Sequence, residues 1–279
     1  MINKSVPIQT LHLFPVLDKL LIELLKSLSP EDWNKPTLAR LWTVKDIAAH
    51  LLDTNMRTIS SGDGYSGKGP ENINSYSDLV NYLNELNANW VKAMDRVSPQ
   101  QLIYLLEITG GQYTNQLTAL DPFVPAKVSV LWAGEEKSDN WFHIAREYTE
   151  KWHHQQQIRE AVNKPGLISR ELFYPCMDTF MRGLPHTYRD VIAEAGTLIE
   201  INIPGDAGGT WYLQKKETGW ILTNDDNKGN IDASITIKPG IAWKLFTKGV
   251  APDYAIERSI IKGDDVLAKK AFHMIAVMA

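Results

Sequence analysis

Hydrophobic residues in the first 100 positions recur at alternating steps of three and four, the pattern of amphipathic helices. The first predicted helix runs from about Leu11 to Leu28, the second starts at Thr43, and the third starts at Ser75. Thr43 and Ser75 are each followed three residues later by Asp, which fits a capping box. We expect the apolar stripes to form a bundle core; the first stripe comprises Phe14, Leu17, Leu21, Leu24 and Leu28.

A fourth predicted helix, residues 141–161, reads WFHIAREYTEKWHHQQQIREA and contains no Gly or Pro. Ser138 or Asp139 can cap its start. Glu150 and His154 are one turn apart, the spacing at which one helix offers two ligands to a metal ion. The plainer alternative is a solvated face with a Glu–His pair. The face carries polar groups where a bundle helix usually carries Leu or Ile, namely His143, Glu147, Glu150, His154 and Gln157.

The second predicted helix carries one histidine beside its apolar stripe. His50 lies about 100° round the helix from Leu51, so it faces the core or the edge of the core. Such a histidine is either a satisfied core group or a ligand, and the pattern alone favours the core group.

Residues 108–134 follow no clear period and contain Pro122 and Pro125, so we interpret them as a long connection. Four long helices with one long crossover predict a four-helix bundle over residues 1–165.

A Gly-rich stretch between residues 60 and 77 contains GDGYSG, which fits G-x-G-x-x-G, and GDGYSGK, which fits the start of a Walker A loop. We reject both motifs, because a helix precedes them where phosphate binding needs a strand. Gly69 also stands where Walker A needs Ser or Thr. The stretch is better interpreted as a loop, of the kind that covers a site.

After residue 165 the chain contains alternating stretches whose hydrophobic period is two residues instead of 3.6. Strands are predicted at residues 198–203, 210–216, 219–225, 231–238 and 258–263. A short helix follows the fourth strand, and Asp264 caps a terminal helix predicted over residues 264–278. In this helix Val266, Ala271, Phe272 and Ile275 are expected to face inward. The order of strands and helices predicts an α+β domain over residues 190–279, with residues 166–189 as a connecting segment. The expected fold class is therefore a helical bundle followed by a smaller α+β domain.

Composition narrows the possible functions. The chain has 279 residues, enough for two domains, with 44% hydrophobic and 22% charged residues. Its net charge of −4 and the lack of a basic run give no support for a nucleic acid partner.

Cys176 is the single cysteine, which excludes an internal disulfide and a zinc site of several thiolates. The sequence shows no signal peptide and no membrane-spanning run, so we expect a cytoplasmic protein without a membrane partner. Nothing in the sequence sets the oligomeric state.

Two segments together resemble a known family. WTVKDIAAHL on the second helix and E-x-x-x-H-H-x-x-Q-I on the fourth resemble the DinB-like metal-binding bundle superfamily. Within it, the chain is most similar to the mycothiol-dependent maleylpyruvate isomerase family, which has Glu where most DinB-like proteins have His. The run EKWHHQQQIRE departs from that branch and is closer to the general DinB-like pattern. DASITIKPGIAWKLFTKG and IIKGDD resemble the family's second domain, which has a sterol-carrier-like α+β fold.

The resemblance implies a metal site made by His50, Glu150 and His154. Two nitrogen ligands and one oxygen ligand leave the fourth coordination position of the metal ion free for water or substrate, as in catalytic zinc sites. Zinc is the expected ion, and Ni²⁺, Fe²⁺ or Mn²⁺ would accept the same ligands. His143 and His153 are poorer candidates, since helical spacing points His153 away from the face of Glu150.

The resemblance also implies a small-molecule substrate and a low-molecular-weight thiol as cosubstrate. In the family, the second domain supplies an arginine to the substrate, and Arg182 and Arg189 are the candidates in this chain.

Three functions remain open at the level of the sequence. The first is a metal-dependent thiol transferase or isomerase, and the second is a hydrolase that uses metal-activated water. The third possibility is a binding protein without catalysis, whose second domain holds an apolar ligand. An exchangeable ligand on the ion would favour an enzyme, and a lipid-like molecule in the second domain would favour the binding protein.

Overall fold

The computed structural model describes residues 5–65, 67, 69, 73–223 and 230–278. Within it the chain forms two compact units. The unit that we call the helical unit comprises Gln9–Pro122, Glu150–Gly166 and the last residues of the chain. The other, the sheet unit, comprises the residues up to Ile8, Phe123–Thr149 and Leu167–Val277. The predicted domains, residues 1–165 and 190–279, concern which segments fold independently, and that division stays a prediction.

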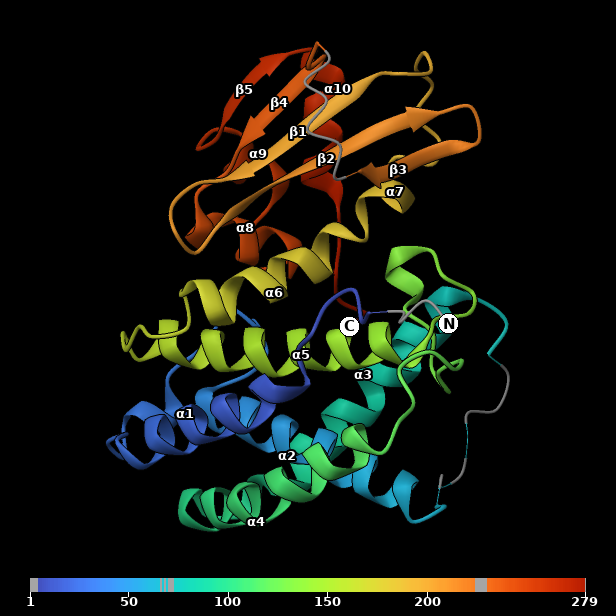
Figure 1. Cartoon of the computed structure of the whole chain (residues 1–279). Helices are drawn as coiled ribbons and strands as arrows, with labels where there is room; N and C mark the ends of the chain where they lie inside the picture. The colour runs from blue at the N-terminus through green and yellow to red at the C-terminus, as the bar shows by residue number, and fades with distance from the viewer. Residues whose placement is uncertain (1–4, 66, 68, 70–72, 224–229, 279) are drawn as a thin grey trace. The chain divides into compact units, whose positions relative to one another are not determined.

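The helical unit is built from the helices that the hydrophobic pattern predicts, and from one more. Figure 1 shows α1, α2 and α4 in the blue-to-green part of the chain, with α5 alongside. Their bounds, and that of α3, are Phe14–Lys26 for α1, Val44–Gly62 for α2, Tyr76–Ala93 for α3, Pro99–Thr118 for α4 and Asn140–Ala161 for α5. α5 passes from one unit to the other, and its second half, from Glu150, belongs to the helical unit.

The interpretation of residues 108–134 as irregular is wrong for their first part, because α4 continues to Thr118. Ser98 caps α4 by accepting a hydrogen bond from the backbone of Gln101 at 3.3 Å. Gly110 and Gly111 lie in the middle of α4 and weaken the helical signal of the sequence. Tertiary packing overrides this weak propensity, since the face with Leu102, Leu106, Tyr113 and Leu117 is buried.

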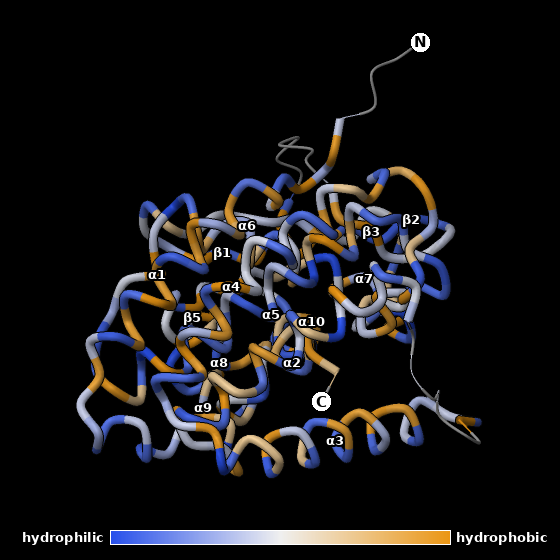
Figure 2. Tube along the Cα trace, turned by 90° about the horizontal axis from the view of Figure 1, so that it is seen from below, coloured by the Kyte–Doolittle hydropathy of each residue, from blue (hydrophilic) through white to orange (hydrophobic). Residues whose placement is uncertain are grey.

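The core of the helical unit lies between α1, α2, α4 and the end of α5. It includes Leu21, Leu25, Ile47, Leu51, Leu102, Leu106 and Ile158. α3 contributes no fully buried side chain, although Figure 2 shows hydrophobic and hydrophilic positions alternating along it. Trp90 attaches α3 to α2 by donating from its indole nitrogen to the backbone oxygen of Ala49 at 2.8 Å.

The sheet unit contains a five-stranded mixed sheet in the order β3-β2-β1-β4-β5. The pair β1–β4 is parallel, and the other neighbouring strands are antiparallel. Ile201 in the central strand pairs with Trp211 on one side and Ile235 on the other. The strands are Leu198–Ile203 (β1), Gly209–Lys216 (β2), Gly219–Thr223 (β3), Ala233–Thr236 (β4) and Ile260–Gly263 (β5).

Helices accompany the sheet within the same unit. α10 packs against β4 and β5, and α7 packs against β3. The bounds are Arg170–Met181 for α6, Leu184–Thr187 for α7, Pro239–Phe246 for α8, Pro252–Ile256 for α9 and Asp265–Lys270 for α10. Two of these helices, α6 and α7, lie in residues 166–189, where the sequence predicts a connecting segment. α6 buries Phe173, Met177 and Phe180.

The predicted class, a helical N-terminal part followed by an α+β part, is confirmed by these elements. The terminal helix is shorter than predicted, since α10 ends at Lys270 and a 3-10 turn follows. Asp264 caps it as predicted and accepts from the backbone of Val266 and Leu267 at 2.9 Å. Val266, expected to face inward, is 80% exposed.

Part of the predicted covering loop, residues 66, 68 and 70–72, lies outside the described residues. Among the helices that are described, none has both the length and the apolar character needed to cross a membrane.

Candidate metal centre

Two helices of the helical unit supply the candidate ligands, and the start of α2 is fixed by the predicted capping box. The backbone of Thr43 donates to Asp46 at 2.8 Å, and the backbone of Asp46 donates to the hydroxyl of Thr43 at 3.3 Å. This cap sets where the helical repeat begins, so that His50 faces inward two turns later with 7% of its surface exposed.

The second contributor is α5, and its middle is buried on every side. Every residue from Lys151 to Arg159 is buried, although most of these residues are polar. An ordinary bundle helix buries one apolar stripe and leaves its polar face in water. Polar side chains buried in this way need partners, because an unpaired polar group in the interior costs free energy.

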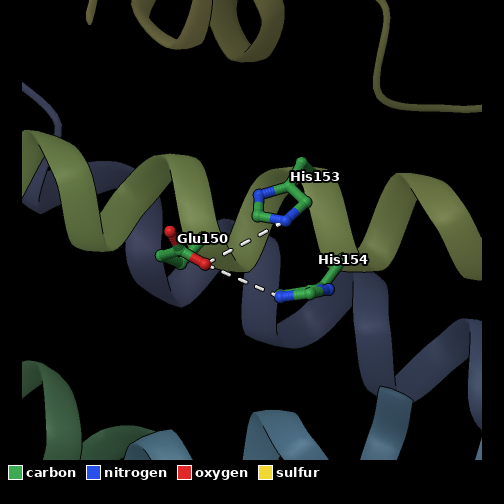
Figure 3. A group of neighbouring side chains, drawn as sticks. All are labelled: Glu150, His153 and His154. Atoms are coloured by element: carbon green, nitrogen blue, oxygen red, sulfur yellow. Dashed lines mark ion pairs between the residues drawn. The ribbon is translucent and has the colours of Figure 1, made fainter. Parts of the chain in front are cut away.

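Glu150 and His154 lie one turn apart with the carboxylate oxygen Oε2 3.6 Å from the imidazole nitrogen Nε2. Figure 3 shows both side chains pointing toward each other on the same side of α5, with His153 joining them. His153 places its Nε2 4.0 Å from the same carboxylate oxygen. The expectation that His153 points away from Glu150 is therefore wrong, because residues three apart are also neighbours on a helix surface. Ligand atoms of the three residues all lie within 4.8 Å of one another.

His50 reaches this cluster from α2. Its ring centroid lies 4.7 Å from that of His154, with the two rings nearly perpendicular. The indole of Trp42, in the turn before α2, packs against both rings, with centroids 4.8 Å from His50 and 6.1 Å from His154. The three residues whose ligand atoms all lie within 4.8 Å of one another are thus Glu150, His153 and His154, and His50 joins them through the contact of its ring with that of His154.

The electrostatics keep His50 neutral. Burial lowers its pKa well below the ordinary value, and the neighbouring His154 lowers that pKa further, while the carboxylate of Glu150 opposes both. Its ring nitrogen Nδ1 is buried and has no hydrogen-bond partner among the residues that the structure describes. A neutral imidazole with an unused buried nitrogen is the form in which histidine binds a metal ion.

His154 is held in an orientation that suits a ligand. Its Nδ1 lies 2.9 Å from the amide oxygen of Gln157, an acceptor, which assigns the ring proton to Nδ1. The Nε2 lone pair then faces Glu150. Metal-binding histidines commonly have their other nitrogen engaged in this way.

The spacing of the side chains fits an ion. Two ligands bound to a tetrahedral zinc ion at about 2.0–2.1 Å lie about 3.3 Å apart. The 3.6 Å between Glu150 and His154 is close to this separation and longer than an ordinary hydrogen bond. The donor set of imidazoles and one carboxylate also suits zinc.

The other predicted candidates, His143, Arg182 and Arg189, lie in the sheet unit. His143 contacts Arg146 at 2.9 Å and lies 4.0 Å from Glu147, and burial lowers the pKa of its imidazole. Arg182, the predicted substrate contact, lies 3.5 Å from the carboxylate of Asp178. Arg189 lies 3.4 Å from Asp190 and is mostly exposed.

Sequence reasoning did not single out Trp42 or Lys151. Trp42 belongs to the segment that carries the family resemblance, so its position next to the histidine-bearing helix is a signal that could have been used. Lys151 gives no such signal, because its partners come from three other helices.

The fold and the cluster define a class of protein, one in which a helical bundle carries a His–Glu–His cluster and is followed by an α+β part with a mixed sheet. The family model described as "Mycothiol maleylpyruvate isomerase N-terminal domain" matches residues 16–159, just over half of the chain. The chain belongs to this family. The matched region contains His50, Glu150 and His154.

A solved structure with a similar fold is that of a histidine-to-alanine mutant of the mycothiol-dependent maleylpyruvate isomerase. It superposes with a TM-score of 0.53 over 89% of this chain and 91% of that chain, at 9% identity. At this identity the similarity shows the fold. A second structure of the mycothiol-dependent maleylpyruvate isomerase aligns with 87% of this chain and 89% of its own, at 9% identity and a TM-score of 0.49. No curated protein matches the sequence.

Proposed function

We propose that the chain binds one divalent metal ion, zinc in the first instance, through His50, Glu150 and His154. The observation that carries this proposal is the ring of His50, with its unused buried nitrogen, packed against His154 one turn from Glu150. Ni²⁺, Fe²⁺ and Mn²⁺ are alternatives with the same ligands. Family membership supports the proposal, because the matched region spans all three residues.

The proposed activity is a thiol-dependent isomerisation or transfer on a small electrophilic molecule. A bound ion with three protein ligands supplies an open position that holds a thiol as thiolate, the nucleophilic form. The chain cannot readily provide this thiol itself, because Cys176 is fully buried in the sheet unit. The cosubstrate is therefore a low-molecular-weight thiol, in keeping with the mycothiol that the family description names.

The side chains around the cluster have separate roles in this proposal. His50 and His154 supply nitrogen ligands, while Glu150 supplies a negative charge that lowers the net charge of the site by one. That lower charge weakens the hold on a second anion and leaves a bound thiolate more nucleophilic. Gln157 orients His154, and Trp42 covers both imidazoles.

The sheet unit has its own role in the proposal, as a sterol-carrier-like domain that contributes to substrate binding. Arg182 is the proposed substrate contact, since an arginine fork binds a carboxylate with two hydrogen bonds. In the free protein it is engaged by Asp178, so a substrate would compete with that carboxylate.

The test begins with elemental analysis of the protein purified without an affinity tag or chelator, where we expect one ion per chain. Cobalt-substituted protein is then mixed in turn with mycothiol, bacillithiol, glutathione and coenzyme A. At least one thiol should produce a sulfur-to-cobalt charge-transfer band. If none does while water on the ion exchanges readily, hydrolysis by metal-activated water replaces the thiol proposal.

A further inference from the structure

One buried ammonium group contacts all three of the other core helices of the helical unit. Lys151 on α5 is 3% exposed. Its Nζ donates to a carboxylate oxygen of Asp18 on α1 and to the amide oxygen of Asn55 on α2, both at 2.9 Å. The same Nζ lies 4.4 Å from the ring centroid of Tyr113 on α4. We call these residues, with Thr109, the lysine network.

The network continues into α4. Asn55 donates from its side-chain nitrogen to the hydroxyl of Thr109 at 2.9 Å, and that hydroxyl donates to the backbone oxygen of Leu105 at 2.7 Å. Asn55 is 1% exposed and Thr109 5%. The amide of Asn55 is therefore bound on both sides and cannot shift without breaking a buried hydrogen bond.

Stability alone does not explain why a lysine occupies this position. A buried ion pair loses its hydration, and replacing it by apolar residues of similar volume is often neutral or stabilising. Hydrogen bonds and ion pairs depend on the positions and orientations of their partners, whereas apolar contacts tolerate sliding. An ammonium bound between fixed oxygens is therefore satisfied in only one register of the helices. The network is thus suited to fixing how far α5 is advanced and rotated relative to α2.

That register decides whether the candidate ligands meet. Lys151 follows Glu150 directly and precedes His154 by three residues, so its position on α5 sets theirs. Asn55 is five residues beyond His50 on α2, about 7.5 Å along the helix axis. The Lys151–Asn55 hydrogen bond therefore joins the two ligand-bearing helices less than two turns from the cluster.

We propose that Lys151 is a positioning residue for the metal centre, which aligns Glu150 and His154 with His50 through its bonds to Asn55 and Asp18. This inference rests on the proposed function, because it assumes that an ion binds these residues. Lys151 touches neither the ion nor the substrate in this role.

The test separates positioning from stability. In the double variant Lys151→Met with Asp18→Leu, both charges of the pair are replaced by apolar side chains. Replacing the ion pair is itself often neutral or stabilising, but the variant leaves the buried amide oxygen of Asn55 without its donor, so we expect an unfolding midpoint near that of the natural chain or slightly below it. Zinc affinity, measured by competition with a chromophoric chelator, should fall about 10- to 100-fold, as it does when groups that orient ligands are lost. The absorption spectrum of bound Co²⁺ should change as well.

A second variant covers the case in which the first does not fold. Asn55→Leu keeps the Lys151–Asp18 ion pair and removes the bonds of Asn55 to Lys151 on α5 and to Thr109 on α4, while Thr109 keeps its bond to Leu105. The expected result is again weaker zinc binding. The conservative variant Lys151→Arg, which keeps a charged donor, should recover part of the affinity.

Arg159→Met is the matched control. Arg159 is also buried on α5, five residues beyond His154, and donates to the backbone oxygen of Leu20 on α1 at 3.1 Å. Its loss should lower the unfolding midpoint and leave the zinc affinity of the folded protein unchanged.

The outcomes are distinguishable. If His154→Ala loses zinc while the double variant and Asn55→Leu bind it as tightly as the natural chain, the positioning role is wrong and the metal centre stands. If Arg159→Met weakens zinc binding as much as they do, the effect is one of stability and the inference fails. If the natural chain binds no zinc, the proposed function and this inference fail together.

Discussion

At the scale of single residues, the candidate ligands of α5 meet at Glu150, whose carboxylate lies 3.6 Å from His154 and 4.0 Å from His153. The sequence spacing of Glu150 and His154 predicts that they are neighbours on one helix, and in the structure Oε2 of Glu150 lies 3.6 Å from Nε2 of His154. His153 lies closer to Glu150 than an ideal step of 100° per residue predicts, because residues three apart are neighbours on a helix and an imidazole reaches far from the helix axis. The partners of Lys151 could not be predicted, since they depend on how three other helices pack.

The first prediction distinguishes the two adjacent histidines. His154→Ala should abolish stoichiometric metal binding, because it removes the nitrogen that faces Glu150. His153→Ala is the matched control and should keep one ion per chain. Elemental analysis of both variants, purified without a chelator, measures the difference. A full complement of metal in His154→Ala, with loss in His153→Ala, would transfer the ligand role to His153.

A second prediction concerns Tyr188 in the sheet unit, which is fully buried and donates its hydroxyl to the backbone oxygen of Leu267 at 2.7 Å. Burial raises the pKa of this phenol above its ordinary value, so the unfolded chain loses the proton first. The stabilisation is complete below the unfolded pKa of about 10 and is lost as the pH rises from there toward the folded pKa. Above pH about 10 this tyrosine should cost up to about 1.4 kcal/mol of stability per pH unit.

Chemical denaturation between pH 8 and 11, at about one-unit steps, measures this slope. Tyr188→Phe should flatten it, and Tyr104→Phe, at a side chain that is 54% exposed, is the comparison. Equal slopes in the natural chain and Tyr188→Phe would refute the prediction.

At the scale of elements, capping and periodicity predicted α1, α2, α3 and α5, and alternation predicted the strands. α4 is not among the predicted helices, because Gly110 and Gly111 weaken the local helical signal of the sequence. Gly110 faces the side chain of Asp18 on α1, which leaves no room for a larger residue. A Cβ at Gly110 would approach the Oδ2 atom of Asp18 to 2.7 Å, whereas a Cβ at Gly111 would meet nothing within 4 Å.

The pair of glycines gives a prediction with an internal control. Gly110→Ala should destabilise the protein by about 1–3 kcal/mol, because Lys151 holds the carboxylate of Asp18 in the way of the new methyl group. Gly111→Ala should stabilise it by up to about 1 kcal/mol, since alanine favours the helix and has open space. Urea unfolding of both variants measures the difference. Equal effects of the two substitutions would show that Asp18 moves aside freely.

At the scale of the whole molecule, the predicted order of a helical part and an α+β part is confirmed, and the contribution of α5 to both units was not foreseen. The first half of α5 belongs to the sheet unit, where Tyr148 is fully buried and donates to the backbone oxygen of Leu172 at 2.7 Å. Hydrophobic periodicity reports that a face is buried and does not report which segment buries it.

The fragment of residues 1–165 tests the predicted domain boundary. We expect it to fold as a helical bundle with a lower melting temperature than the full chain, because it lacks the segment that receives the hydroxyl of Tyr148. Circular dichroism on heating measures both. A fragment that melts at the same temperature as the full chain would show that the rest of the chain does not stabilise the bundle. An unfolded fragment would show that the predicted boundary is wrong.

The continuous burial of Lys151–Arg159 has a consequence for how this sequence can vary. A helix with one buried stripe tolerates change at the positions between its core residues, so accepted substitutions recur with the helical period. Here nine consecutive positions have no side that faces water. A library of all single substitutions should therefore show an unbroken block of intolerant positions across this segment, with no 3.6-residue rhythm. Natural variation in the segment would then need compensating changes in its neighbours, and it would diverge more slowly than α3.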